Sequence, residues 1–564
     1  MKKWLQETHG TKFELLRHFL LRFFDSDLIT SPGQVTPAVI GGITVFLPWF
    51  PVMIAPLHHK YAYVSSLDSP DAYLRAVRAD ELWLVTLMMS TIGLLTAIKW
   101  QSVFPSLRDY RALAALPLRS YQIFQTKFTA LLIAATTAIL VLNLLPSFLF
   151  PMVSGGRWAL NSSFVVRAAV HAIACVAGCY FFFFALVALQ GILLLLLTLR
   201  IFGRVSGAIQ AIVVPAMLVL VVLSFSIQPK ITATVLEPRL ASWLPPVWFL
   251  GLYQRMLGDP DPGMHVLADR ALWALLISVL LSVLTYAVCY HRHRAMLMEG
   301  VAAAPKKKRR NLPVLEWLFP NPRQQAVIAF TLKTLAGSSQ HRIILTAYAG
   351  FGLAVLLSGI VGLGAVVGQA KLHAAIFVYA HVVMLAFLLV GLRHLFSIPT
   401  ELRANWIFQL CEADSRQEWL DAIDRLVLLA GGIAMLLIPF PLEYELLGLR
   451  AIAEVALFAA TAFVCYEAIF RSWEKLPFTC SHLPGKTPMW LVALRLYAFL
   501  WLLPVPNFIL LGCLYHPTAF FIIFLALMAL GVHLRFSRRE YNSQIRLVYE
   551  ESIEPAVQTL SLLR

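Results

Sequence analysis

Residues 166–196 read VRAAVHAIACVAGCYFFFFALVALQGILLLL and contain one formal charge, at Arg167. A helix needs about 20 consecutive, predominantly apolar residues to cross the hydrocarbon core of a bilayer. This stretch is longer than one upright span requires, so we expect a transmembrane helix that tilts or that ends in a surface segment. The stretch therefore predicts an integral membrane protein.

The whole chain has a composition that agrees with this prediction. Of its 564 residues, 59% are hydrophobic and 13% are charged, whereas soluble globular domains have about 45–50% and about 25%. The apolar residues are gathered in blocks at Thr36–Pro56, Leu82–Ile98, Phe128–Phe150, Val166–Leu196, Ile209–Ile227, Ala271–Tyr290, Ile343–Val367, Ala374–Leu392, Leu426–Pro441, Ile452–Phe470, Trp490–Leu511 and Ala519–Val532. We predict an all-α fold, a polytopic transmembrane helix bundle of about twelve spans.

A polar and basic stretch separates the first six blocks from the last six. It runs from His291 to Arg342 and contains the charge run Lys306–Arg310, with prolines on its far side, which is typical of a linker. Residues 13–24 have the pattern of an amphipathic helix that lies on the membrane. The predicted domains are a first transmembrane unit at 1–294, a basic cytoplasmic linker with a surface helix at 295–342, and a second transmembrane unit with a basic tail at 343–564.

The formal net charge is +16, and two partners explain such an excess: nucleic acid or the anionic inner face of a bilayer. No basic stripe with interleaved aromatic residues marks a soluble domain, so we expect a lipid bilayer and no nucleic acid. Most of the 46 lysines and arginines fall in the connections that share a side with the N-terminus. By the positive-inside rule both termini are cytoplasmic, and a bacterial cytoplasmic membrane is the expected location.

Several short motifs resemble functional sites without having the necessary context. Residues 480–487, CSHLPGKT, end like a phosphate-binding P-loop, but Cys480 stands where the first glycine is required and no strand precedes the motif. The pairs His291/His293, His58/His59 and Asp25/Asp27 lack further ligands at metal-binding spacing. We therefore expect no catalytic residue, no metal and no bound cofactor.

Ionisable side chains inside the predicted spans are functional candidates because burying them in lipid is costly. They are His171, His381, Glu454 and Glu467. His381 lies deepest, where a hydrogen-bonded packing role and a proton relay both remain open. We expect Glu454 to reach water near the outer end of its span, and Glu467 to pair with Arg471 one turn later. No span carries the several facing acids and bases that an ion-coupled pump requires.

A weak internal repeat links the two halves of the chain. Residues 107–112, LRDYRA, follow the second block, and residues 400–405, TELRAN, follow the eighth. Each short amphipathic segment leads into a polar stretch with an aromatic residue and then into a new apolar block. Parallel repeats of this kind are common in transporters, while chance similarity is the alternative that the residues leave open.

Residues 106–127, SLRDYRALAALPLRSYQIFQTK, resemble the cytoplasmic loop between spans 2 and 3 of type-2 ABC export permeases. The matching positions are Asp109, Leu113, Leu116–Pro117, Ile123 and Lys127. Residues 243–252, WLPPVWFLGL, are similar to the proline- and tryptophan-rich outer helices that such permeases carry between spans 5 and 6. The resemblance covers residues 36–294 and only faintly the second half. Members of that family have about six spans and pair as dimers, whereas this chain holds two such units.

The resemblance implies a permease that hydrolyses nothing itself. A separate ABC ATPase subunit would dock on cytoplasmic coupling helices, and ATP-driven closure would tilt the bundle to expel a substrate whose identity stays open. The implied docking residues are Arg108, Asp109, Tyr110 and Arg111 in the first half and Glu401, Arg403 and Trp406 in the second; ordinary solvated faces are the alternative for these residues. The alternative functions are a secondary transporter and a membrane-embedded enzyme or assembly subunit that acts on lipid-linked substrates.

Overall fold

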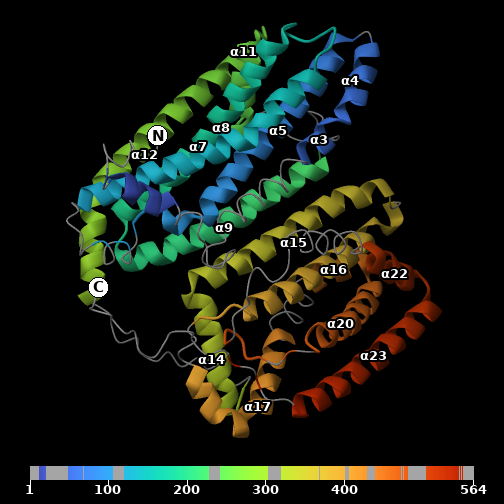
Figure 1. Ribbon diagram of the computed structural model, residues 1–564. Helices are drawn as coiled ribbons and strands as arrows, with labels where there is room; N and C mark the ends of the chain where they lie inside the picture. The colour runs from blue at the N-terminus through green and yellow to red at the C-terminus, as the bar shows by residue number, and fades with distance from the viewer. Residues whose placement is uncertain are drawn as a thin grey trace, which may run out of the picture. The chain divides into compact units, whose positions relative to one another are not determined.

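The computed structural model describes residues 10, 12–20, 49–67, 69–105, 109, 113, 120–227, 242–302, 319–366, 369–400, 405–428, 439–471, 473, 475–479, 504–544, 547 and 549 (Figure 1). Over these ranges the chain forms helices and no β-strand. Nine of the described helices are long and apolar enough to cross a membrane. These findings confirm an integral membrane protein built as an all-α helical bundle.

The nine long helices each match one of the predicted apolar blocks, to within one residue at the end of the block. They are α5 (Pro70–Ile98), α7 (Ser120–Val153), α8 (Phe164–Leu196), α9 (Leu199–Ile227), α12 (Pro262–Ala302), α15 (Ser339–Val366), α16 (Gln369–Phe396), α20 (Arg450–Ile469) and α23 (Pro517–Gln544). The blocks predicted at Thr36–Pro56, Leu426–Pro441 and Trp490–Leu511 lie in large part outside the described residues. Helix α8 has 33 residues and is about 50 Å long at 1.5 Å per residue, which exceeds the hydrocarbon thickness of about 30 Å.

The chain divides into two compact units, Met1–Lys307 and Lys308–Arg564. The division falls in the basic run Lys306–Arg310. Shorter elements accompany the long helices. In the first unit these are α3 (Trp49–Ile54), α4 (Leu57–Ser66), η1 (Trp100–Ser102) and α11 (Pro245–Leu257); in the second they are α14 (Pro322–Gly337), α17 (Asn405–Val427), α19 (Phe440–Leu447) and α22 (Pro504–Tyr515).

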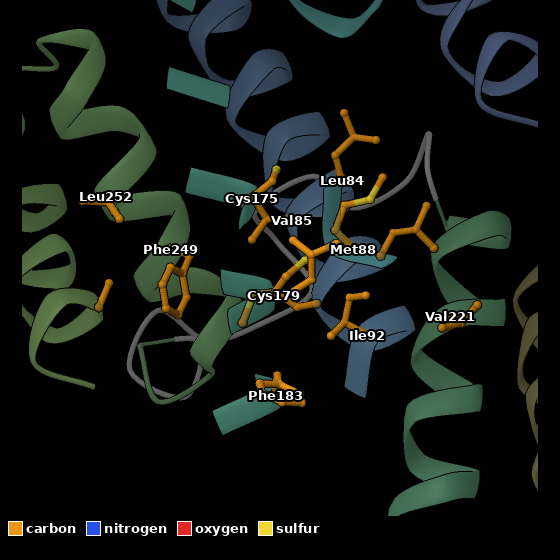
Figure 2. Packing of buried hydrophobic residues seen from close by; sticks show 14 of the residues in the cluster. Leu84, Val85, Met88, Ile92, Cys175, Cys179, Phe183, Val221, Phe249 and Leu252 are labelled. Atoms are coloured by element: carbon orange, nitrogen blue, oxygen red, sulfur yellow. The ribbon is translucent and has the colours of Figure 1, made fainter. Parts of the chain in front are cut away.

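Helix α8 is central to the first unit, where it contacts α5, α7, α11 and α12. The core of this unit is a cluster of buried apolar residues that includes Met88 of α5, Cys175 and Cys179 of α8, and Phe249 of α11 (Figure 2). Both cysteines are free thiols, and they fill space between helices.

Helix α11 packs tightly against the start of α12. A methyl group added at Gly251 would lie 2.4 Å from Leu267 Cβ and 2.9 Å from the backbone nitrogen of Ala268. Only a residue without a side chain allows two helix backbones to approach so closely. The short helix thereby forms a rigid hairpin with α12 in place of a free connection.

In the second unit, α16 is the central helix and contacts α15, α20 and α22. Its buried residues Ala375, Val378 and Val383 share one apolar cluster with Leu457 of α20 and Leu510 of α22. The polar side chain His381 lies on the same helix and is 4% exposed. The centre of this unit therefore encloses a titratable group within apolar packing.

Candidate functional site

The segment that carries the resemblance to ABC permeases is anchored to the first unit at its described positions. Asp109 is 2% exposed, and its Oδ2 lies 3.7 Å from Nζ of Lys127 on α7. Leu113 belongs to one buried cluster with Ile123 of α7 and with Phe19 of the helical residues 12–20. The Lys127 ammonium also lies 4.8 Å from the centre of the Phe19 ring. The matched positions therefore interact with one another in space.

The predicted docking residues are only partly described. Asp109 faces the protein interior, whereas Trp406 on α17 is 59% exposed. Arg108, Tyr110, Arg111, Glu401 and Arg403 lie outside the described residues. The structure thus places Asp109 in the attachment of the segment, and docking by the other positions stays a prediction.

A second polar group is buried at the other end of the first unit. Asp80 of α5 is fully buried and accepts hydrogen bonds from Lys60 Nζ at 2.7 Å and from Tyr61 OH at 2.6 Å, both on α4. The neighbouring Glu81 is also buried and accepts a hydrogen bond from Gln254 of α11. These contacts tie the two short helices to α5.

Sequence reasoning missed Asp80 and Glu81 because the apolar block begins only at Leu82. The helix begins at Pro70, with Ser69 as N-cap: its hydroxyl accepts a hydrogen bond from the Ala72 amide at 3.4 Å. A serine followed by proline is a recognisable start signal. That signal predicts a helix that begins at Pro70 and includes both Asp80 and Glu81.

Glu81 and Gln254 border a small cavity of about 20 Å³. Arg78, Glu81, Arg167, Tyr253 and Gln254 are among its lining residues. Burial, and after it the Glu81 carboxylate, raises the pKa of Tyr253 well above its usual value of 10, so the phenol stays a neutral donor. A cavity of this size has room for about one water molecule. His171, a candidate from the sequence, lies behind this cavity, with Nδ1 3.3 Å from Tyr253 OH.

In the second unit, Arg538 of α23 joins three helices. It is 5% exposed, it pairs with Asp424 of α17, and its Nη1 lies 3.3 Å from Glu467 Oε2 on α20. Tyr466 donates a further hydrogen bond to Asp424. The expected pairing of Glu467 with Arg471 is wrong. Arg538 on α23, which is distant in the chain, reaches Glu467 inside the bundle, and Arg471 contacts Ser537 Oγ at 3.3 Å.

A further buried group of titratable side chains surrounds His381. Its Nδ1 lies 2.7 Å from Oε1 of Glu454 on α20, and its Nε2 lies 3.2 Å from Oε1 of Glu443 on α19. Glu443 and Glu454 are 0% and 3% exposed. The imidazole therefore has a carboxylate at each nitrogen, and all three side chains are shielded from solvent within the unit.

A tight turn brings the two carboxylates to the same ring. Glu443 stands in the first turn of α19, where the helix dipole favours a negative charge. Gly448 ends this helix with φ 59° and ψ −135°, a conformation that glycine adopts and other residues avoid. The chain then reverses into α20, which carries Glu454. Burial, and after it the Glu454 carboxylate, raises the pKa of Glu443 to about 7, against the opposing effect of His381.

This arrangement changes two expectations drawn from the sequence. Glu454 does not reach water, because α19 and α16 cover it. Facing acids and bases do occur within the described residues, since His381 lies opposite Glu443 and Glu454. Glu443 was missed because it follows the short apolar block at Leu426–Pro441 and lies in no predicted span.

Comparison with protein-family models, with curated proteins and with solved structures finds no match for this chain. A functional assignment therefore depends on the residues and contacts described above.

Proposed function

We propose that this protein is the membrane-spanning permease subunit of an ATP-driven exporter of the ABC type, and that a separate ATPase subunit docks on residues 106–119. The observation that carries the proposal is the anchoring of this segment, through Asp109 to Lys127 and through Leu113 to Ile123. In this proposal the chain catalyses no reaction and transmits movement to its transmembrane helices.

The physical requirement for such coupling is a stiff attachment. A segment held only by its two ends would absorb the movement of a docked ATPase without passing it on. Here a buried ion pair and a buried apolar cluster join the segment to α7 and to residues 12–20. Breaking one side of a buried ion pair typically costs about 3–5 kcal/mol. A force on the segment would therefore move α7 before the contacts separate.

The order of elements in the first unit supports the same proposal. Between α9 and α12 the chain forms α11, which contacts α5, α8 and α12. The resemblance implies an outer helix between spans 5 and 6, and α11 stands in that order. The 106–119 segment follows the C-terminal end of α5, and α11 follows the C-terminal end of α9. Because α5 and α9 are antiparallel, these two ends lie on opposite sides, in keeping with one cytoplasmic and one outer element in the predicted orientation.

The test is purification of the full chain from its native membranes, followed by identification and assay of any P-loop ATPase that accompanies it. We expect an ATPase subunit whose turnover the chain stimulates. The double variant Arg108→Glu/Arg111→Glu should lose most of the bound ATPase. The matched control is Arg157→Glu, an exposed arginine beyond the opposite end of α7, which should retain it. Absence of any ATPase, or equal retention by both variants, contradicts the proposal.

A second candidate function, cation-coupled secondary transport, is favoured by one observation. The buried His381 between Glu443 and Glu454 is an enclosed group that can take up positive charge, as ion-coupled transporters require. This candidate predicts solute movement driven by an ion gradient in vesicles that contain the chain and no ATPase. Loss of that movement in Glu443→Gln, with retention in the exposed control Glu445→Gln, would support it.

A further inference from the structure

Three potential metal ligands converge inside the second unit. His381, Glu443 and Glu454 each offer a ligand atom, and these atoms all lie within 4.8 Å of one another. We infer that the three residues form a binding site for a divalent transition-metal cation, and that Zn²⁺ fits the donor set best. This site is separate from the anchoring of residues 106–119, so the inference does not depend on the proposed permease function.

The spacing of the facing atoms accommodates a coordinated cation. His381 Nε2 lies 3.2 Å from Glu443 Oε1, at the long end of the range for an N–H···O hydrogen bond, about 2.7–3.2 Å. Two ligands of a tetrahedral zinc ion, with bonds of about 2.0–2.1 Å, are about 3.3 Å apart. The observed gap matches that separation.

The contact at the other nitrogen indicates which ring nitrogen of His381 carries the proton. Glu454 Oε1 lies 2.7 Å from Nδ1, which is the length of a hydrogen bond that Nδ1–H donates. In that tautomer Nε2 directs a lone pair toward the Glu443 carboxylate. Two acceptors facing each other require a cation between them. A carboxylate that orients a metal-binding histidine in this way is a recurrent feature of zinc sites.

Glu443 also lacks the hydrogen bonds that a buried carboxylate normally has. Neither of its oxygens has a hydrogen-bond partner among the described residues, and Oε2 of Glu454 is likewise unsatisfied. Buried charged groups in proteins are paired or coordinate metals. The unsatisfied oxygens point to an additional positive ligand at this place.

Charge balance indicates that the ligand is a divalent cation. In the deprotonated form that binds a metal, a neutral imidazole and two carboxylates carry a net charge of −2, and a divalent cation makes the group neutral. The surroundings are apolar: the Phe458 ring lies 4.6 Å from the imidazole, and Leu457 and Leu510 line the small cavity beside it. In such an environment a neutral complex is strongly favoured over an uncompensated charge.

The donor set distinguishes among cations. Mg²⁺ and Ca²⁺ take oxygen ligands, whereas imidazole nitrogen and carboxylate oxygen together are typical of Zn²⁺. The small cavity borders both His381 and Glu454, so a water molecule there can occupy a remaining coordination position.

The test uses the full-length protein in lipid nanodiscs, treated with a chelator and then titrated with ZnCl₂. We expect about one tightly bound Zn²⁺ per chain, measured by elemental analysis, and a raised unfolding midpoint. Co²⁺, added in place of Zn²⁺, should give the visible absorption of a cobalt ion bound by nitrogen and oxygen. Glu454→Gln should weaken binding about 10–100-fold, the usual effect of losing a supporting carboxylate. Glu443→Gln, which removes a direct ligand, should weaken it more.

Two controls lie on the same helices. His373 of α16 and Glu445 of α19 are exposed, and His373→Gln and Glu445→Gln should bind Zn²⁺ like the wild type. Equal binding by all four variants would overturn the assignment. A wild-type protein that takes up no stoichiometric Zn²⁺ and shows no Co²⁺ absorption would also overturn it, and would leave a shared proton as the cation between Nε2 and Glu443.

Discussion

The Lys127 ammonium lies 3.7 Å from the Asp109 carboxylate, and both side chains are buried. Lys127 belongs to the first third of α7, while Asp109 belongs to the segment that precedes it. The same lysine covers the Phe19 ring at 4.8 Å. A single cation thus connects the segment, a transmembrane helix and the helical residues 12–20.

This relationship predicts the outcome of a double-mutant cycle. Lys127→Met should lower the free energy of unfolding by about 3–5 kcal/mol, because it leaves the Asp109 carboxylate buried without a partner. Asp109→Asn should cost less, and the combination Asp109→Asn/Lys127→Met should be more stable than Lys127→Met alone. Unfolding in detergent by chemical denaturant measures all four proteins. Additive effects would contradict a direct interaction between the two side chains.

The long helices were predictable from sequence because twenty apolar residues in lipid have few alternatives to a helix. The helix ends were less predictable. The apolar block at Leu82–Ile98 omits the first part of α5, whose polar residues Asp80 and Glu81 are satisfied by α4 and α11. Such partners are distant in the chain and leave no mark in the local hydropathy.

Only part of the candidate site was predictable from the sequence, again because the interacting residues are distant in the chain. His381 and Glu454 stand out as titratable residues inside apolar blocks, but their contact spans 73 positions. Glu443 has no such signal, since it lies in a short helix after proline residues. Only the turn at Gly448 brings it back to the imidazole. Arg538 lies in the basic tail of the predicted second unit, and the sequence does not indicate its partners Asp424 and Glu467.

Arg538 provides a second prediction, for the charge network that joins α17, α20 and α23. Arg538→Met should destabilise the second unit by about 3–5 kcal/mol, because the buried Glu467 and the partly buried Asp424 would both lose this cation. Arg538→Lys should recover only part of the loss, since one ammonium cannot reproduce a guanidinium group that contacts two carboxylates. The neighbouring Arg539→Met is the control. A denaturation midpoint unchanged in Arg538→Met would mean that the network contributes nothing to stability.

The close approach of α11 and α12 gives a third prediction. A methyl group at position 251 would lie 2.9 Å from a backbone nitrogen, and backbone atoms cannot move aside as a side chain does. Gly251→Ala should therefore destabilise the protein by about 1–3 kcal/mol. Gly203→Ala on α9 is the matched control, because nothing lies within 4 Å of its added methyl group. Thermal unfolding of the two variants, compared with wild type, decides whether the hairpin is packed this closely.

The turn between α19 and α20 gives a fourth prediction. Gly448 has φ 59° with ψ −135°, so Gly448→Ala should cost about 1–3 kcal/mol of backbone strain. An added methyl group meets no atom within 4 Å at this position, so the loss would come from the backbone and not from crowding. In the control Gly512→Ala the glycine is helical and equally uncrowded, and alanine should leave stability unchanged or raise it by up to about 1 kcal/mol. Equal midpoints for the two variants would exclude strain at Gly448.

Alkaline pH should destabilise the first unit through Tyr61. Burial, and after it the Asp80 carboxylate, raises the pKa of this phenol well above its usual value of 10. The folded state therefore keeps the proton while the unfolded chain releases it. The stabilisation is fully present below about pH 10 and is lost as the pH rises from there toward the folded pKa. Between pH 10 and pH 11, the free energy of unfolding should fall by about 1 kcal/mol more in the wild type than in Tyr61→Phe. Tyr63, which is 67% exposed on the same helix, supplies the control: Tyr63→Phe should follow the wild-type pH dependence. A Tyr61→Phe variant as sensitive to alkali as the wild type would show that the phenol ionises in the folded protein, and that the hydrogen bond to Asp80 does not hold its proton.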